Sequence, residues 1–477
     1  MNDNGKSVGI ALALLTTAAG VVYLCLAKPG YVSDINVLGA LILCQLMIVS
    51  IWHYEKTFLM VLVISFMLAG LDTPLLGAGI VLRWFVLGVG AAVGYIKWMK
   101  AHREPFAGFH LAALFCVFAA LVSAMVSAMP TMALLKVLSL VLMFLYGASG
   151  ARLAIMNDPA RFIQGLVLAC EITAFATALC YFGLHYAIFG NPNSLGAVIG
   201  VVIAPVLLWS VLVADQRYIR QRRAVAFFLC LILLYSSQCR AGIISATVSI
   251  IITCLIMGRR KLLVQATFYT ILALAAAGVL APAELEDFTS NITTTLVYKG
   301  KQEQGLFGSR KTPWQNTVSV IREHPWFGSG FGTSEIAPTS ATTGISKVYT
   351  VEETTREHGS SYLTMVEWLG LLGVVPFTVL LFFLVLNVIR VYAWMARNGS
   401  AFHYSIPIAM IMTAALVHAV FEDWLLAVGF YLTVFFWAMA FILNDLLPAS
   451  QRAATYNPWC PMPAPPLPQV DPVPSAT

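Results

Sequence analysis

Three basic side chains interrupt strongly apolar stretches of the sequence and are the first candidates for chemistry. Arg240 stands at a polar corner between two apolar blocks, and Arg83 and Lys136 stand near the ends of two others. An ionisable side chain in such a setting is costly unless it meets a partner or a ligand, so it indicates a binding site. The alternative for Arg83 and Lys136 is that the long side chain reaches out of the apolar layer. Glu171, in the middle of another block, needs a partner that the sequence does not identify.

More chemistry-bearing residues lie in polar segments further along the chain. One long segment contains Arg310, Arg356 and His358, and a short one contains the adjacent carboxylates Glu422 and Asp423. The planar fork of arginine suits a concentrated negative charge, and the pKa of histidine suits proton transfer near neutral pH. The alternatives are ordinary surface ion pairs for the arginines and a plain loop position for the carboxylates.

The composition excludes a soluble protein of ordinary type. Hydrophobic residues make up 59% of the 477 positions, charged residues only 10%, and the mean hydropathy is +0.83. A soluble chain of this length needs far more surface charge. The net charge of +6 arises from short basic clusters between apolar blocks, which is typical of cytoplasmic loops of membrane proteins and argues against nucleic-acid binding. The cysteine spacing suggests neither a metal site nor a disulfide framework.

The apolar blocks predict an all-α polytopic integral membrane protein with about 14 transmembrane helices, since a span needs about 20 apolar residues. The predicted spans lie near 8–27, 35–51, 58–71, 78–99, 108–128, 132–151, 162–189, 194–213, 224–238, 241–257, 262–281, 361–389, 404–420 and 424–445. Asn193, which follows Pro192, is expected to start a span, with substrate contact as the alternative. A Pro-rich cytoplasmic tail is predicted for 448–477.

Connections that are rich in lysine and arginine alternate with connections that contain few, and this pattern predicts the direction of the spans. Basic clusters such as 97–103, 217–223 and 259–261 fall in every second gap. The pattern predicts that both termini are cytoplasmic. It places residues 1–281 in eleven transmembrane helices, residues 282–360 in one large extracytoplasmic loop, and residues 361–447 in three further helices.

The large loop carries signals of local structure. Thr312 and Pro313 are typical of a helix start, and Trp314, Val318 and Ile321 then form an apolar stripe at helical spacing. A glycine-rich turn follows at 327–332. The segment is therefore expected to carry short helices above the membrane, either as a structural cap or as part of a site.

Four patches of this sequence, in one order along the chain, resemble the O-antigen ligase and polysaccharide polymerase superfamily of bacterial envelope enzymes. They are Phe189-Gly-Asn-Pro-Asn-Ser-Leu-Gly196, Ser236-Ser-Gln-Cys-Arg-Ala-Gly242, Arg310 to Trp314 with His324-Pro-Trp-Phe-Gly-Ser-Gly-Phe-Gly332, and His358-Gly-Ser-Ser-Tyr-Leu363 with Glu367 and Gly370-Leu-Leu-Gly373. Two positions depart from the family pattern. Gly359 replaces the usual asparagine after the histidine, and Cys239 replaces a small residue before Arg240.

The resemblance implies a metal-independent membrane glycosyltransferase of GT-C-like architecture in the bacterial inner membrane, without a cofactor. Such enzymes take a glycan from undecaprenyl diphosphate at the periplasmic face. A polymerase passes it to another lipid-linked glycan, and a ligase passes it to lipid A–core. The resemblance also implies the bilayer, a chain-length regulator and export machinery as partners. Chain length and the number of spans favour exopolysaccharide or O-antigen polymerase over ligase.

The family positions also imply roles for the residues above. His358 is expected to activate the acceptor hydroxyl, with Arg310 and Glu422 as further catalytic residues. Substrate-binding roles are expected for Arg240, Arg83, Arg356, Lys136, Asn193 and Asp423. The competing hypotheses are a lipid-linked glycan transporter or flippase and a non-catalytic assembly subunit. A transporter is disfavoured because the sequence has no convincing internal repeat.

Overall fold

The computed structural model describes residues 76–100, 108–156, 158–186, 188–189, 191–280, 308–334 and 357–448, with isolated positions before residue 27 and at 290 and 294. All regular secondary structure in these ranges is helical. The helices are α4 (Leu76–Lys100), α5 (Gly108–Met125), α6 (Pro130–Leu145), η2 (Tyr146–Ala151), α7 (Arg152–Met156), α8 (Pro159–Ala178), η3 (Leu179–Gly183), α9 (Pro192–Ala197), η4 (Val198–Ile203), α10 (Ala204–Leu212), α11 (Arg217–Ser236), α12 (Arg240–Ile256), α13 (Arg260–Leu280), α15 (Gly308–Glu323), α16 (Ser361–Asn398), α17 (Ser405–His418) and α18 (Tyr431–Asp445).

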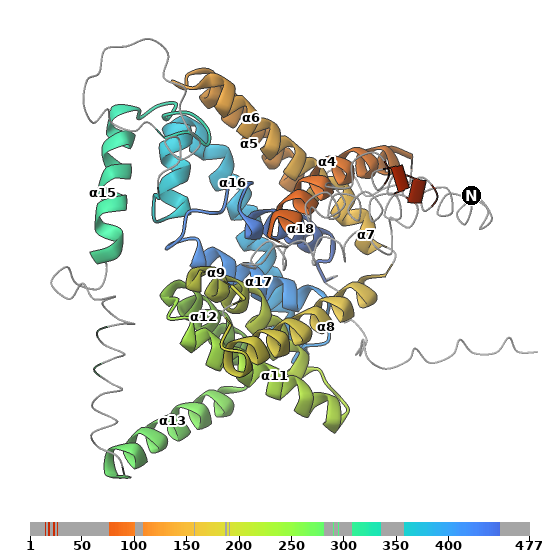
Figure 1. Cartoon of the computed structure of the whole chain (residues 1–477), viewed down its shortest axis with the longest axis vertical. Helices are drawn as coiled ribbons and strands as arrows, with labels where there is room; N and C mark the ends of the chain where they lie inside the picture. The colour runs from red at the N-terminus through yellow and green to blue at the C-terminus, as the bar shows by residue number, and fades with distance from the viewer. Residues whose placement is uncertain are drawn as a thin grey trace, which may run out of the picture.

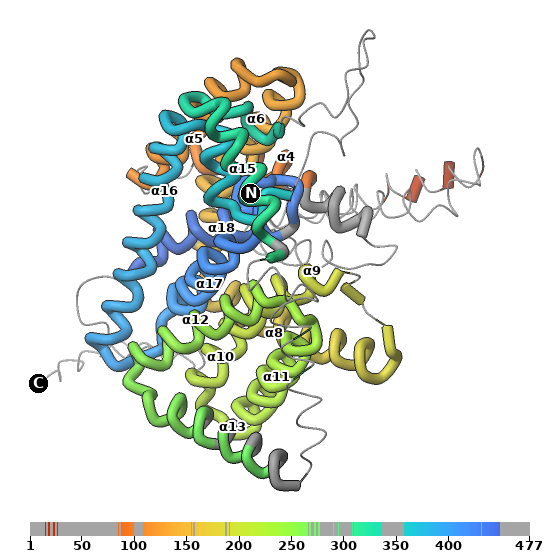
Figure 2. The backbone as a smooth tube through the Cα atoms, turned by 90° about the vertical axis from the view of Figure 1, so that its left-hand side faces the viewer, coloured from red at the N-terminus to blue at the C-terminus, as the bar shows by residue number. Residues whose placement is uncertain are grey.

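Two helices form the centre of the bundle. In α17 every residue from Ser405 to Met412 is buried, and α18 is buried from Leu432 to Leu443. A helix that is apolar all round is found inside a bundle of other helices or in contact with lipid. Accordingly α17 packs against α10, α12, α16 and α18 (Figures 1 and 2).

The outer helices expose large apolar side chains. On α16, Leu371, Leu372, Val375, Val379 and Phe382 are exposed, and α5 and α6 expose similar rows. Five helical segments are long and apolar enough to cross a membrane: Gly108–Met125, Pro130–Ala151, Pro159–Gly183, Pro192–Leu212 and Ser361–Asn398. An all-helical protein with this much exposed apolar surface is consistent with a membrane protein.

The predicted spans from 78–99 onward each fall on a helix of the structure, but several bounds were wrong. The predicted span 224–238 corresponds to α11, which begins earlier, at the basic residue Arg217, and ends at Ser236. The last predicted span begins at Tyr431 and not at 424, because residues 419–430 form an irregular connection. The three predicted spans before residue 72 lie outside the described residues, apart from isolated positions in the first of them. The total of fourteen, the direction of insertion and the domain boundaries stay predictions.

The predicted helix start in the large loop was also wrong. α15 includes Gly308 and runs to Glu323, so Thr312 is no N-cap and Pro313 lies inside the helix. Pro313 is the sixth residue of the described helix, and it supplies no N–H to the carbonyl four residues earlier. Arg310 therefore lies in the first described turn of α15.

Two of the family-like patches pack directly on each other. A Cβ on Gly200 would collide with the backbone of Gly242, and a Cβ on Gly242 would collide with the backbone of Gly196. These glycines therefore let α9–η4 and α12 approach at backbone distance, as small residues do between membrane helices. Cys239 Sγ donates a hydrogen bond to the Asn193 carbonyl at 3.9 Å, so the beginning of α9 lies beside the Arg240 corner.

The other two patches pack on each other at a break in α16. Gly370 has φ +65°, a backbone conformation that favours glycine, and a Cβ there would collide with the backbone of Trp326. The broken helix bonds to the glycine-rich turn instead: Ser329 N–H donates to Glu367 O at 2.9 Å, and Leu371 N–H donates to Pro325 O at 2.8 Å. The turn that follows α15 is therefore fixed on α16.

Glu171 has the partner that the sequence did not reveal. Its Oε1 lies 3.2 Å from Arg223 Nε, and its Oε2 lies 2.7 Å from Arg222 Nη2. Arg223 also donates to the Ser210 carbonyl at 3.1 Å. Glu171 and Arg223 are both buried, so this cluster joins α8, α10 and α11. Its role is structural.

Candidate functional site

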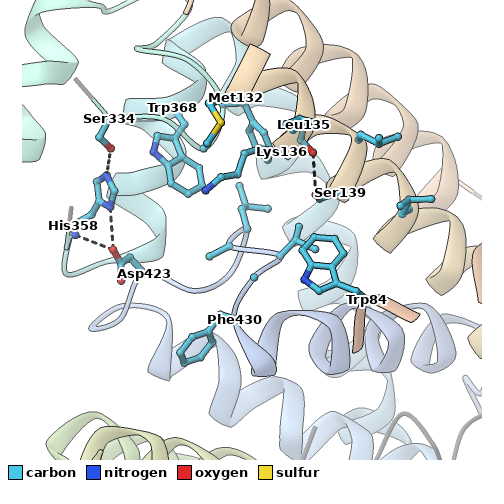
Figure 3. Close-up of a pocket in the computed structure, with 18 residues that line it drawn as sticks. Trp84, Met132, Leu135, Lys136, Ser139, Ser334, His358, Trp368, Asp423 and Phe430 are labelled. Atoms are coloured by element: carbon cyan, nitrogen blue, oxygen red, sulfur yellow. Dashed lines mark hydrogen bonds and ion pairs between the residues drawn. The ribbon is translucent and has the colours of Figure 1, made fainter. Parts of the chain in front are cut away.

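His358 lies at the centre of a chain of three polar side chains. Its Nε2 is 2.8 Å from Ser334 Oγ, and its Nδ1 is 3.0 Å from Asp423 Oδ2. The backbone N–H of His358 also donates to Asp423 Oδ2, at 2.8 Å. Figure 3 shows Ser334, His358 and Asp423 in one line beside a pocket. Because a carboxylate only accepts, Nδ1 carries a proton, and in the neutral ring Nε2 is the acceptor for a hydroxyl.

Ser361, in the first turn of α16, brings Asp423 to His358. Ser361 Oγ donates to Glu422 O at 2.6 Å and accepts from the backbone N–H groups of Trp424 and Leu425, both at 3.0 Å. Ser361 N–H donates to the carbonyls of Ala419 and Glu422. One serine therefore holds the irregular connection between α17 and α18 against the turn that carries His358.

A second carboxylate lies on the other side of the imidazole. Glu367 Oε1 is 3.3 Å from His358 Nε2, and the Glu367 side chain is fully buried. Burial alone lowers the pKa of His358, but hydrogen bonds and charges from Asp423 and Glu367 outweigh it, so the pKa is raised above its ordinary value. Burial raises the pKa of Asp423, and the bonds to His358 outweigh this effect and lower it. An imidazolium at this position is therefore well stabilised.

Arg310 closes the site from the α15 side. Its Nη1 pairs with Glu357 and its Nη2 pairs with Glu422, the neighbours in sequence of His358 and Asp423. Burial raises the pKa of Glu422, and the Arg310 charge offsets only part of this, so the pKa of Glu422 stays raised. The adjacent carboxylates thus have different contacts, since Asp423 orients His358 and Glu422 holds Arg310.

The backbone conformation at Gly359 explains why glycine can replace the asparagine of the family pattern. It has φ +73°, a region in which asparagine is tolerated better than most other residues with a side chain. Its carbonyl accepts a hydrogen bond from Trp314 Nε1 at 3.1 Å, which fastens α15 to the turn at His358. Glycine and asparagine both satisfy this backbone, so the substitution leaves the orientation of His358 intact.

Arg240 lies at the first position of α12 and is half-buried. It is near enough to Arg310 for the two positive charges to repel each other. Arg310 also acts electrostatically on His418, at the end of α17. Two guanidinium groups whose charges act on each other from different helices are typical of an anion-binding site.

A cavity of about 650 Å³ borders His358. His358, Asp423, Ser334 and Lys136 supply its polar lining. Its other lining residues are mostly apolar: Trp84, Met132, Leu135, Leu138, Ser139, Leu142, Phe331, Gly332, Trp368, Leu426, Ala427, Val428, Gly429 and Phe430. An apolar pocket with a few convergent polar groups is the usual form of a ligand site.

The structure brings together most of the predicted site residues. His358, Asp423, Glu422, Arg310 and Arg240 form one group, and Lys136 reaches it from the cavity side. Asn193 lies at the beginning of α9, beside the Arg240 corner, and is not part of the cavity lining. The cap of α9 is Asn191, whose side chain accepts a hydrogen bond from Asn193 N–H at 2.8 Å. Arg83 belongs to α4, but its side chain is outside the described residues, as is all of Arg356.

Sequence reasoning did not assign site roles to three residues that contact this group. Ser334 follows the glycine-rich turn, and nothing in its sequence context distinguishes it from other loop serines. Glu367 does carry a signal, since a carboxylate inside an apolar span needs a reason to be there. Ser361 acts through its bonds to a connection some sixty positions away, which no local pattern reveals.

One known protein family matches the part of the chain that contains several of these residues. The O-antigen ligase family matches residues 225–378, which include Arg240, Arg310 and His358. The match ends before Glu422 and Asp423. A comparison with curated protein sequences finds no match. The family match covers about a third of the chain and supports an enzyme of ligase or polymerase type in envelope glycan assembly.

Proposed function

We propose that the chain is an envelope polysaccharide polymerase, a multi-pass glycosyltransferase of the bacterial inner membrane. It transfers a glycan from undecaprenyl diphosphate to the hydroxyl of a second lipid-linked glycan at the periplasmic face. The observation that carries the proposal is the placement of His358 between Asp423 and a hydroxyl group, beside the Arg310–Arg240 pair.

In the proposed reaction His358 is the general base. Its neutral Nε2 takes the proton of the acceptor hydroxyl while the acceptor oxygen forms a bond to the anomeric carbon of the donor glycan. The bond between this carbon and the diphosphate oxygen breaks, and the lipid diphosphate leaves as an anion. Asp423 and Glu367 stabilise the imidazolium that results. No metal is required in this scheme.

The arginines are proposed to bind the leaving diphosphate. Arg310 already holds two carboxylate oxygens, one from Glu357 and one from Glu422, and phosphate oxygens present the same kind of acceptor. Glu357 is the exposed partner, at 62%, so a diphosphate can displace it at little cost, while Glu422 keeps the guanidinium in position. Arg240 then adds a second charge from α12.

The ligase reaction, with lipid A–core as acceptor, is the alternative within the same chemistry. A flippase is a different class and uses neither a base nor a leaving group. The preference for polymerase rests on the number of predicted spans. The acceptor is therefore the point that an experiment must decide.

The decisive assay is expression of the chain in a host that lacks its own polymerase and ligase but makes lipid-linked repeat units. We expect a ladder of polymerised glycan on gels, which His358→Ala and Arg240→Ala abolish. Transfer of single units to lipid A–core supports the ligase instead. Unchanged glycan length with an altered leaflet distribution contradicts both enzymes and supports the flippase.

The periplasmic position of the site is tested separately. Single cysteines introduced at Ser340 and at Ser475, in a variant without other cysteines, report the side of the membrane through a thiol reagent that does not permeate. We expect labelling of intact spheroplasts at position 340, in the 282–360 loop, and none at position 475, in the tail. Protection at position 340 reverses the proposed direction.

A further inference from the structure

The cavity beside His358 does not include the arginine pair. Ser334, Asp423 and His358 line the cavity, whereas Arg310 and Arg240, both within the described residues, are not among its lining residues. A transfer reaction needs its leaving group on one side of the reacting carbon and its acceptor on the other. If the arginines hold the diphosphate, the cavity is the place from which the acceptor approaches.

Ser334 marks the position of the acceptor hydroxyl. Its Oγ is 2.8 Å from His358 Nε2, the distance that a general base requires from the hydroxyl it deprotonates. The residue belongs to the short turn 331–334 that borders the cavity, so an arriving sugar meets it directly. The acceptor hydroxyl reaches Nε2 by taking the place of the serine hydroxyl.

Lys136 is the one cation that lines this cavity in the described part of the chain. Figure 3 shows its side chain pointing from α6 toward Trp368, into the site, which differs from the outward course of a lysine that reaches for bulk water. Its stem packs on Gly332, where an added Cβ would lie 2.9 Å from Lys136 Cγ. The ion pairs among the described residues include none with Lys136, and Asp423, the acidic residue of the cavity lining, pairs with His358.

The walls of the cavity suit sugar rings. Trp84, Phe331, Trp368 and Phe430 supply aromatic surface around the single ammonium group. Aromatic faces pack well against the C–H faces of a sugar, and a half-buried cation among apolar walls gains most from a counter-ion on the ligand. The volume of about 650 Å³ is within the range of small-ligand pockets, about 300–1,000 Å³.

We propose that this cavity binds the acceptor sugar, and that Lys136 pairs with an anionic group on that sugar. The group is a carboxylate, as in a uronic acid, or a phosphate, since both present oxygens to one ammonium group. The proposal rests on the proposed function and narrows its acceptor to acidic glycans.

Binding to the purified full-length protein tests the proposal directly. The probes are methyl glucuronide, glucose 6-phosphate and the neutral methyl glucoside, followed by ligand-observed NMR in detergent. We expect at least one acidic probe to bind about tenfold more tightly than the glucoside, which corresponds to about 1.4 kcal/mol. The stronger of the two acidic probes tells carboxylate from phosphate.

Substitutions test whether Lys136 causes the preference for acidic sugars. Lys136→Met should remove the preference for the acidic probe, Lys136→Arg should keep it, and Lys261→Met, at an exposed lysine of α13, should leave it unchanged. Equal binding of all three sugars to the wild type, or an unaltered preference in Lys136→Met, overturns the proposal. So does competition at this site by undecaprenyl phosphate but by none of the sugars, because the cavity would then hold the lipid.

The glycan ladder separates this proposal from the broader function. If His358→Ala abolishes the ladder while Lys136→Met leaves the KM for the acceptor unchanged, the acceptor site is wrong and the polymerase stands. If the proposal is right, Lys136→Met raises the acceptor KM about tenfold and changes kcat less than about threefold, because it removes ground-state binding. A ladder unaffected by His358→Ala contradicts the polymerase itself.

Discussion

The carboxylate of Asp423 accepts two hydrogen bonds from His358, one from ring Nδ1 at 3.0 Å and one from the backbone N–H at 2.8 Å. The two bonds fix both the position of the turn and the rotation of the imidazole. Nδ1 is thereby held in its protonated form, and Nε2 is directed at the hydroxyl of Ser334. The arrangement resembles the base and its orienting carboxylate in hydrolases, but here it borders the predicted membrane surface.

Asp423→Asn should lower the rate and change its pH dependence. Activity needs neutral His358, so it is lost as the pH falls through the pKa of this residue. Because the carboxylates raise that pKa, the acidic limb of the wild-type profile should lie above pH 6.5. Removing the Asp423 charge lowers the pKa and moves the limb to lower pH, while kcat falls by about 10²-fold or more.

The measurement is the pH profile of kcat/KM for glycan transfer by the purified protein. Asp215→Asn, at an exposed carboxylate between α10 and α11, serves as the control and should leave the profile unchanged. An acidic limb that stays in place in Asp423→Asn would show that His358 is not the titrating group.

Ser334→Ala should remain active within about threefold of the wild type. In the proposed reaction the serine hydroxyl gives way to the acceptor and forms no bond with the glycan. Ser319→Ala, at an exposed serine of α15 outside the cavity, is the control. A loss of activity comparable to that of His358→Ala, with the fold intact, would instead identify Ser334 as a nucleophile that His358 activates.

Arg310→Lys should reduce transfer by at least about tenfold, although the charge is conserved. A lysine is a point charge and cannot bind Glu422 and the diphosphate with two separate nitrogens. Arg322→Lys, at an exposed arginine in the last turn of the same helix, should have no effect. Equal rates for both variants in the transfer assay would show that the fork geometry of Arg310 is unimportant.

Most of the helices could be predicted from the sequence because their signal is local. A block of about 20 apolar residues already satisfies the length of a span, so α5, α6 and α16 follow from hydropathy alone. The beginning of α18 could not be predicted in this way. Residues 424–430 are as apolar as the helix they precede, and hydrogen bonds to the side chains of Ser361, Thr433 and Trp437 hold them in an irregular connection.

The site was predictable in its residue types but not in its contacts. Hydropathy and the family resemblance identified Arg240, Arg310 and His358. Which of the two adjacent carboxylates orients His358 depends on a side-chain direction fixed through Ser361, and sequence carries no such information. The same holds for Ser334, whose role follows from the docking of the glycine-rich turn on the break in α16.

Gly359→Asn should be tolerated, whereas Gly359→Val should abolish transfer. The backbone has φ +73°, and a Cβ lies 3.2 Å from Trp314 Nε1 and 3.3 Å from Arg310 Cδ, so a small adjustment is needed even for asparagine. Valine adds a branched side chain that disfavours this conformation and presses on both partners. Gly399→Val is the control, since Gly399 has φ +59° but open space around it. Loss of transfer in both valine variants, together with loss of folded protein, would show that backbone strain and not crowding at Arg310 is responsible.

Glu171→Gln should destabilise the bundle without changing the chemistry of the site. The substitution leaves the buried guanidinium of Arg223 without its counter-charge, which costs about 3 kcal/mol when one partner of a buried pair is removed. Arg222→Gln removes the exposed partner, 43% accessible, and should cost less than about 1 kcal/mol. Thermal unfolding of the detergent-solubilised protein measures both effects, and transfer at low temperature should be unchanged in each. If Glu171→Gln instead reduces transfer while its unfolding temperature equals that of the wild type, the cluster between α8, α10 and α11 is coupled to the reaction and its role is more than structural.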